Sequence, residues 1–178
     1  RDDSRNIVMD VVVKPDGQHF VTGSLTGRVD LGGNCGLFNA NGTGSDGYLA
    51  KYDDSGQCRW VRRFYTESTQ PMPEACHSNS RQERGNKLVL NQGIVYVAGT
   101  LEGCSYGGAT GTMSSNNQAV FENPVSPITP LPYDNAASAG FVVEYADNGA
   151  LGSVQLFRTE KTTPATGLDP SSSLSDMV

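Results

Sequence analysis

Short apolar runs recur along the chain, and each is soon interrupted by residues that favour turns. Val, Ile, Phe and Tyr dominate the runs, while Gly, Pro, Asp, Asn and Ser separate them. β-Branched and aromatic residues favour strands, whereas glycine, proline and short polar side chains favour turns. No sustained apolar stripe at helical spacing is present. The pattern predicts an all-β chain of short antiparallel strands.

The predicted strands fall into two groups of four. The first group comprises residues 7–13, 20–25, 48–52 and 60–65, and the second comprises residues 88–90, 94–101, 141–145 and 153–157. Pro15-Asp16-Gly17 and Asp147-Asn148-Gly149 are predicted to form hairpin turns, because glycine adopts positive φ at little steric cost.

The two groups are copies of one sequence unit. Residues 11–27 (VVVKPDGQHFVTGSLTG) match residues 87–103 (KLVLNQGIVYVAGTLEG), and GYLAKYDDSG from Gly47 matches GFVVEYADNG from Gly140. Phe157 answers Phe64 after the second match. Repeat units bury their apolar faces by stacking on their neighbours. The matches therefore predict two four-stranded antiparallel units, residues 1–86 and 87–160, with a linker and the start of a possible third unit in residues 161–178.

The strings HFVTGSLTG and GSDGYLAKYDDSGQCRWVRRF resemble the SBBP-type β-propeller repeat of secreted and cell-surface proteins. The repeat has a Tyr-Val-x-Gly strand, matched by residues 96–99, and a later strand carrying Trp, matched by Trp60. The resemblance implies two propeller-type blades within a larger propeller or repeat assembly, because a propeller needs about four to eight blades. The second unit departs from the pattern, with Glu144 in place of Lys51 and Ser153 in place of Trp60.

Two further segments bear on this organisation. Residues 116–139 contain four prolines, which argues against a central strand. We expect a long excursion there that packs over a blade, extends toward a partner or forms a flexible surface insertion. Residues 175–178 (SDMV) resemble residues 8–11 (VMDV), and the chain begins at Arg1. Both features predict a processed or excerpted segment of a longer repeat protein, or blades completed by neighbouring copies.

The chain has four cysteines, none in a CxxC pair, which favours two disulfides over a zinc site. The candidates are Cys35, Cys58, Cys76 and Cys104. Of the three possible pairings we favour Cys58–Cys76, because Cys76 follows the strand carrying Cys58, together with Cys35–Cys104, which lie in comparable loops. Free buried thiols are the alternative. The sequon at Asn41 makes that residue a glycosylation candidate. These features predict a secreted or cell-surface protein.

Charge and composition limit the partners. The formal net charge is -6 and the sequence pI is near 4.8, which argues against binding nucleic acid. The densest basic cluster, Arg59, Arg62 and Arg63, is better explained as the solvent face of a strand. No apolar run is long enough to cross a bilayer, so we predict no membrane insertion.

Candidate chemistry is sparse, and we predict no catalytic, cofactor-binding or metal-binding residue. His19 and His77 lack an HxH or HxxxH partner and are predicted to be surface or hydrogen-bonded side chains. Asp53-Asp54-Ser55-Gly56 lacks the later glutamate of a calcium loop and is predicted to be a turn. The recurring aromatic residues are predicted to form core packing between units rather than a sugar-stacking platform. They are Tyr48, Tyr52, Trp60, Phe64, Phe141, Tyr145 and Phe157.

The sequence thus predicts a non-catalytic extracellular structural or adhesive repeat protein, such as a surface, sheath or filament component. Its partners would be other protein subunits or further repeats of the same chain. The alternative is a propeller that binds glycans or another ligand through its long loops, and a propeller hydrolase or lyase ranks third. Fold alone does not decide among these functions.

Overall fold

The computed structural model describes residues 4–40, 44–68, 82–102, 116–124, 131–134 and 138–158, and these ranges contain strands and turns but no helix. Each of the eight predicted runs lies within an observed strand, so the all-β class is confirmed. The strands are β1 (Arg5–Val13), β2 (His19–Thr26), β3 (Arg28–Asp30), β4 (Leu37–Asn39), β5 (Ser45–Tyr52), β6 (Cys58–Ser68), β7 (Arg84–Asn91), β8 (Ile94–Glu102), β9 (Asn116–Phe121), β10 (Leu131–Asp134), β11 (Ser138–Ala146) and β12 (Leu151–Arg158).

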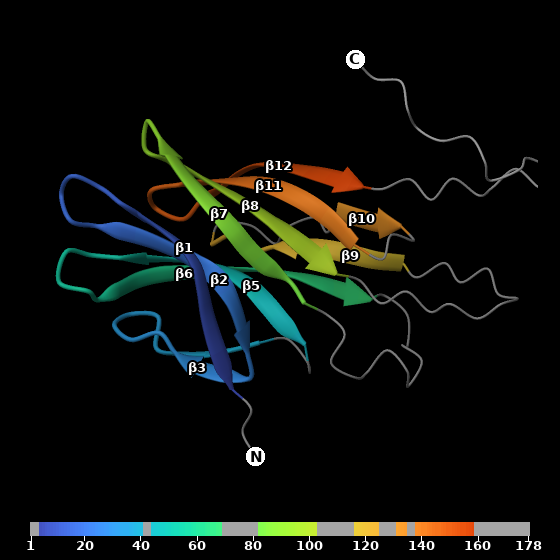
Figure 1. Ribbon diagram of the computed structural model, residues 1–178, viewed down its shortest axis with the longest axis horizontal. Coiled ribbons are helices and arrows are strands. Elements are labelled where there is room, and N and C mark those ends of the chain that lie inside the picture. Colours follow the sequence, from blue (N-terminus) through green and yellow to red (C-terminus); the bar gives the residue numbers. More distant parts are fainter. Residues whose placement is uncertain are drawn as a thin grey trace, which may run out of the picture.

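Two antiparallel meanders form the frame of the molecule (Figure 1). The strands β7, β8, β11 and β12 make a four-stranded sheet by themselves. The strands β1, β2, β5 and β6 belong to a six-stranded sheet, because β9 and β10 pair onto the edge of β6. The prediction of two separate four-stranded units is therefore wrong for the first unit, whose β6 edge is covered by strands from the long insertion. Both sheets are open rather than closed into a ring.

The insertion behaves differently from the predicted excursion. It contains β9, which lies between β6 and β10 and is therefore an interior strand. The β9 sequence, NNQAVF, has no proline, whereas Pro132 lies in β10 at the edge of the sheet. Proline is tolerated at such an edge because its missing N–H costs no ladder hydrogen bond there. Pro127 and Pro130 lie outside the described residues.

The two meanders share one hydrogen-bonding register. Phe20 pairs with Lys51 as Tyr96 pairs with Glu144, and the outer ladders match in the same way. The ladders also shift register at corresponding points. In the ladder of the first two strands the shift lies between Val8 and Asp10 in the first unit and between Gly85 and Lys87 in the second. In the ladder of the last two strands it lies next to Lys51 in the first unit and next to Glu144 in the second. A slip of one residue would send every side chain to the opposite face. The copies are therefore structurally equivalent residue by residue.

This register defines equivalent positions and two faces for each unit. The front face carries Phe20, Leu49 and Phe64 in the first unit, and the back face carries the side chains between them. Val11 is equivalent to Leu88 rather than to Lys87, because the first hairpin loop is one residue longer than the second. Front-face pairs are Val12 and Val89, Phe20 and Tyr96, Thr22 and Ala98, Leu49 and Val142, Lys51 and Glu144, Trp60 and Ser153, and Phe64 and Phe157.

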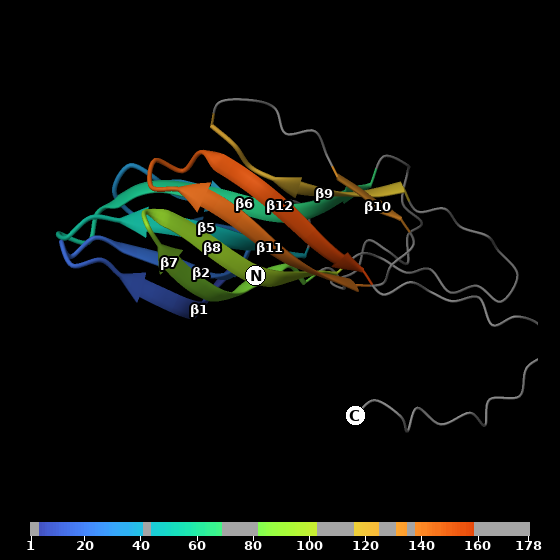
Figure 2. The ribbon, with the colours of Figure 1, turned by 90° about the horizontal axis from the view of Figure 1, so that it is seen from above.

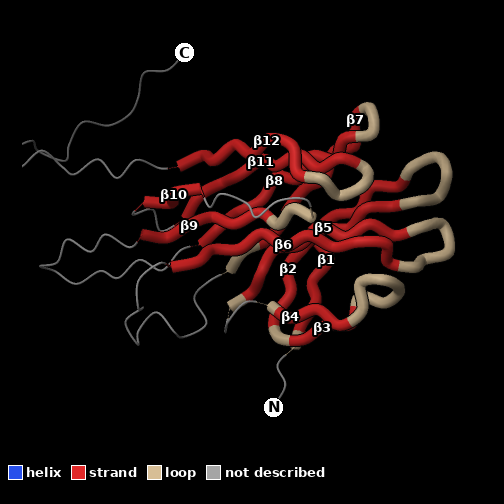
Figure 3. The backbone as a smooth tube through the Cα atoms, turned by 180° about the vertical axis from the view of Figure 1, so that it is seen from behind, coloured by secondary structure: helices blue, strands red, loops and turns tan. Residues whose placement is uncertain are grey.

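The units stack front to back. The front face of the first unit packs on the back face of the second, which carries Val97, Phe141 and Val143. The β3–β4 hairpin covers the back face of the first unit and forms a second apolar cluster with it. Figure 2 shows the two meanders as neighbouring layers, and Figure 3 places β3 and β4 on the side of the first meander away from β12.

Both predicted hairpin turns are confirmed. The Gly17 N–H donates to the Lys14 carbonyl, and the Gly149 N–H donates to the Ala146 carbonyl. The φ angles of Gly17 and Gly149 are 85° and 80°, in the region that glycine adopts most easily. The turn at Gly149 matters beyond its own hairpin, because it reaches the front face of the first unit.

Candidate functional site: the packing faces of the two units

Three phenylalanine rings form the centre of the contact between the units. Phe64 comes from the first meander, Phe121 from β9 and Phe141 from the second meander, and all three are buried. The Phe141 centroid lies 5.0 Å from that of Phe64 and 5.2 Å from that of Phe121, in edge-to-face arrangements. Such pairs add about 0.5–1.5 kcal/mol to the burial of their area. The contact is thus a packed core.

Glycines make room for these rings. A Cβ atom added at Gly47 would lie 2.0 Å from Phe64 Cε2, and one added at Gly99 would lie 2.4 Å from Phe141 Cζ. A Cβ atom at Gly85 of β7 would lie 1.9 Å from Thr22 Oγ1. The strands can therefore approach this closely only because those positions lack a side chain.

A polar cluster joins the units beside the aromatic core. The Asp147 carboxylate, in the turn between β11 and β12, accepts hydrogen bonds from Lys51 Nζ at 2.5 Å and from Lys14 Nζ at 3.2 Å. Trp60 Nε1 donates to the Asp147 carbonyl at 3.1 Å, and Arg62 Nε donates to the Gly149 carbonyl at 2.8 Å. One turn of the second unit is thereby held by four side chains of the first.

The charges of this cluster influence one another. Partial burial acts to raise the pKa of the Asp147 carboxyl, but the hydrogen bonds and positive charges of Lys51 and Lys14 outweigh burial, so the pKa lies below its usual value of 3.8. Lys51 is almost fully buried and lies over the Phe20 ring, 5.6 Å from its centroid. A buried cation needs a partner of opposite charge, and Asp147 supplies it.

The first strands of the two units also meet. The Leu88 N–H of β7 donates to Asp10 Oδ2 at 2.8 Å, and Lys87 Nζ lies 3.2 Å from the same oxygen. The hydrogen bond from Leu88 is the largest influence on the Asp10 carboxyl, and it lowers the pKa of that group. The irregularity between Val8 and Asp10 lies directly before this contact. The bulge thus serves the contact between units as well as the twist of the sheet.

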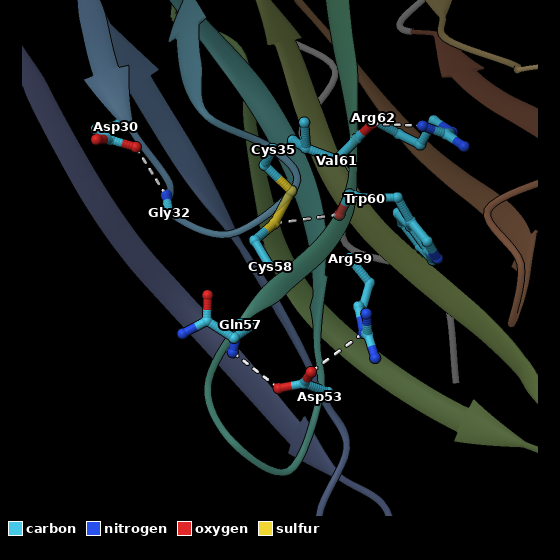
Figure 4. Close-up of a disulfide and its surroundings, with 10 residues drawn as sticks. All are labelled: Asp30, Gly32, Cys35, Asp53, Gln57, Cys58, Arg59, Trp60, Val61 and Arg62. Carbon is cyan, nitrogen blue, oxygen red and sulfur yellow. Dashed lines mark hydrogen bonds and ion pairs between the residues drawn. A yellow bond between two sulfur atoms is a disulfide. The ribbon is translucent and has the colours of Figure 1, made fainter.

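The β3–β4 hairpin covers β2, β5 and β6 on the back face of the first unit and leaves β1 exposed. Figure 4 shows the disulfide that fastens this hairpin. Leu31 and Phe38 of the hairpin segment belong to the same apolar cluster as Tyr48 and Ala50 of β5. A disulfide between Cys35 and Cys58 fastens the loop of the hairpin to the start of β6, with the two Cα atoms 5.6 Å apart. The hairpin is therefore a covalently fastened cap on this face.

Two of the four candidate cysteines thus form a disulfide, but the favoured pairing was wrong. The prediction joined Cys58 to Cys76 because Cys76 follows the strand that carries Cys58. The hairpin instead folds onto its own sheet, which brings Cys35 over Cys58, and the Asn34 N–H donates to the Cys58 carbonyl at 2.8 Å. Cys76 and Cys104 lie outside the described residues. The glycosylation candidate Asn41 and the histidine His77 also lie outside them.

The front face of the second unit has no covering layer in the described part of the chain. Val89 is 56% exposed and Phe157 is 55% exposed, and Tyr96, Ala98 and Val142 between them are only partly buried. The equivalent side chains Phe20, Leu49 and Phe64 of the first unit are fully buried. Sequence reasoning missed this asymmetry. The sequence difference that signals this asymmetry is Ser153 in the second unit, at the position that Trp60 occupies in the first.

The arginine cluster has a different environment from the one expected. Arg59 is exposed, as predicted for a solvent-facing side chain. Arg62 lies against Trp60 on the front face, and Arg63 pairs with Glu122 at 2.6 Å on the back side of the sheet. The prediction was wrong for Arg62 and Arg63, because this strand is covered on both faces.

The recurring aromatic residues divide between two clusters. Trp60, Phe64, Phe141 and Tyr145 belong to the core between the units, as predicted. Tyr48 and Tyr52 instead pack under the hairpin, where burial raises the pKa of Tyr48 to about 12. Phe157 is exposed, which contradicts the prediction of core packing for that residue. The prediction treated both copies alike, although only one front face has a neighbour.

Other predicted polar residues have local roles. The His19 ring stacks on Tyr52 with centroids 5.3 Å apart. Asp53 Oδ1 accepts hydrogen bonds from the N–H groups of Ser55 and Gln57, which is the geometry of a polar turn. Within the described ranges no group of three or more His, Cys, Asp or Glu is placed to hold a metal ion, and no helix is long and apolar enough to cross a membrane.

The buried polar groups of the described residues include Glu83 and the Tyr145 hydroxyl. Glu83 is nearly fully buried and accepts a hydrogen bond from Thr66 Oγ1 at 2.5 Å. The Tyr145 hydroxyl is buried in the core between the units without a hydrogen-bond partner, and its burial raises the pKa of that group. Both groups lie beneath packed side chains rather than in an open site.

The fold and these faces define a class: an all-β protein with a duplicated, bulged meander whose copies pack front to back. A scan of the sequence against protein-family models finds no match, and a search of curated proteins finds no significant relative. The resemblance to SBBP-type repeats therefore stays a prediction.

Proposed function

We propose that this chain is a non-catalytic structural or adhesive repeat protein of the cell surface or extracellular space, whose β units mediate protein–protein assembly. The observation that carries the proposal is the front-to-back contact of two equivalent units. Such a contact uses two different faces, so it can repeat without closing on itself after two units. A unit of this kind is suited to an extended or ring-shaped array.

The arrangement of the units supports a propeller-type array as the finer form of this proposal. Both units are meanders, and their first strands approach through the contact of Asp10 with Leu88. In a propeller, four-stranded sheets pack face to face around a common axis. We propose that the two meanders are neighbouring blades of such an array, with β9 and β10 added to the outer strand of the first.

The extracellular setting is supported by the disulfide. Disulfides persist in oxidising compartments and are rare where glutathione keeps thiols reduced. Cys35 and Cys58 form such a bond in the cap, and the sequon at Asn41 follows β4 closely in the sequence. A cap that is fastened by a disulfide suits a protein that works outside the cytosol.

The test is the state of the protein in its natural setting. Antibody against the chain is used to locate it on intact cells or in the surrounding medium, and the purified material is examined by electron microscopy and sedimentation. We expect surface or extracellular location, an intact Cys35–Cys58 bond by peptide mass analysis, and assemblies larger than a monomer. Cytosolic protein, or monomers that bind no cell-surface or matrix component, would overturn the proposal.

A further inference from the structure

We infer that the front face of the second unit is a docking surface for the back face of one further β unit of the same kind. The inference rests on the proposed function, because it names the partner for assembly. The surface is defined by Val89, Tyr96, Ala98, Val142 and Phe157. It continues an interface that the molecule already contains, since each of these positions has an equivalent in the first unit that contacts the second.

The two front faces match position by position. Phe64, buried against Phe141, corresponds to Phe157, which is 55% exposed. Thr22 is fully buried, and a Cβ atom added at Gly85 would lie only 1.9 Å from its Oγ1. Ala98 takes the place of Thr22 and keeps a small side chain. The second front face therefore retains an apolar centre and, at the position where Gly85 of the neighbouring strand comes close to Thr22, a side chain smaller than threonine.

A second copy of this chain has no free back face with which to occupy the docking surface. A second copy of this chain cannot present the back face of its first unit, because the β3–β4 hairpin, fastened by the Cys35–Cys58 disulfide, already covers β2, β5 and β6 on that face. The back face of its second unit is already buried against its own first unit. The partner is therefore a separate unit of the same type whose back face is open, whether it lies in a longer chain or in another subunit.

Glu144 in the docking surface determines which charge the partner carries opposite it. In the existing contact Lys51 of the front face binds Asp147 in the last turn of the neighbouring unit. Glu144 replaces Lys51 in the second front face, at the same register position. An acidic group opposite Glu144 would be repelled, whereas a basic group would be attracted. The docking unit thus carries Lys or Arg at the position equivalent to Asp147.

The test is a three-unit chain, made by adding a second copy of residues 82–158 after the full sequence. The original second unit carries A98C, and its reaction with a thiol reagent reports whether the front face is covered. Three versions of this chain differ only in the charges that meet at the docking surface. The first has no charge substitution, the second carries D147K in the added unit, and the third carries E144K in the original second unit. The chain without A98C corrects for reaction of the native cysteines.

We expect D147K in the added unit, or E144K in the original one, to slow labelling of the A98C thiol at least about tenfold relative to the two-unit chain, because docking must open before the thiol reacts. The unchanged version brings Asp147 opposite Glu144 and should be protected less. V13C on β1, whose parent residue is 63% exposed, serves as the control and should react equally in all versions.

Two results would overturn the inference. The first is an A98C thiol that reacts, in both the D147K and the E144K versions, as fast as it does in the two-unit chain. This result counts against the inference also when circular dichroism shows that the added unit stays unfolded. The other is protection of A98C in the two-unit chain at high concentration, which would mean that two front faces pair with each other. If the natural protein assembles but the A98C thiol is not protected in the three-unit chains, only this inference is refuted. If the A98C thiol is protected but the natural protein does not assemble, only the proposed function is refuted.

Discussion

Phe64 and Phe157 occupy the same position in the two copies, yet Phe64 is fully buried while Phe157 is 55% exposed. Each phenylalanine pairs with a glycine on one side, Gly47 or Gly140. On the other side Phe64 also pairs with Phe121 of β9, whereas Phe157 lies on the edge strand β12. The difference therefore has two sources: the layer that covers the sheet, and the added strand β9 beside Phe64. A neighbouring unit covers the first front face, and the described part of the chain contains none for the second.

The back faces differ in the opposite sense. Leu88 on the first strand of the second unit is buried, whereas the equivalent Val11 in the first unit is 52% exposed. Cys58 is replaced by Leu151 at the equivalent point of the last strand. The first unit thus fastens its own hairpin over its back face where the second unit uses a neighbour. The hairpin leaves β1 uncovered, so it substitutes only in part for a second sheet.

The strongest test of the difference between the two front faces is to replace each of the two phenylalanines by alanine. F64A removes a fully buried ring and should destabilise the protein by about 3–5 kcal/mol, whereas F157A should cost less than about 1 kcal/mol because its ring is already half exposed. Urea unfolding of the two variants gives both values. Equal losses would mean that the second front face is covered in solution.

Removal of the disulfide tests whether the cap holds the first back face. The bond closes a sequence separation of 23 residues, and its loss in the double variant C35A/C58A should lower the free energy of unfolding by about 3 kcal/mol. In the variant, the amides of the β3–β4 hairpin should also exchange hydrogen faster than they do in the parent protein. The amides of β8, which the disulfide does not fasten, serve as the reference. Unchanged stability and exchange would show that apolar packing alone holds the hairpin.

Local chemistry made the strands predictable, and contacts between distant elements did not follow from it. Alternation and turn residues located every strand of the two meanders, because both signals act within a few residues. The pairing of Cys35 with Cys58 depends on how a loop folds over a sheet, which spacing does not encode. The addition of β9 to β6 likewise joins segments far apart in the sequence.

The candidate site shows the same limit. The repeat predicted that equivalent aromatic residues pack between units, and this holds for Phe64 and Phe141. It could not tell which front face has a neighbour, so Phe157 was placed in a core that does not cover it. A repeat fixes equivalent positions, whereas the ends of the array decide which of them are buried.

Glycine substitutions sharpen the comparison at a smaller scale. G47A would place a Cβ atom 2.0 Å from the Phe64 ring, while at the equivalent Gly140 the nearest atom, Phe157 Cβ, would be 3.7 Å away. We expect G47A to cost about 2 kcal/mol through overpacking, and G140A to be nearly neutral. Thermal unfolding of both variants measures the difference. A destabilised G140A would indicate that a neighbour presses on the second front face.

The smallest expected effect is a pH dependence that belongs to the contact between the units. Lys51 and Lys14 hold the pKa of Asp147 below 3.8 in the folded protein, so the unfolded chain binds its proton more readily. The stabilisation is therefore complete above about pH 5 and is lost as the pH falls through the folded pKa. D147N should be less stable at neutral pH and lose less stability on acidification. D54N, at the equivalent turn of the first unit, is the matched control. Since Asp147 is partly exposed and screened by solvent, a steep acid transition that D147N leaves unchanged would place the responsible carboxylate elsewhere.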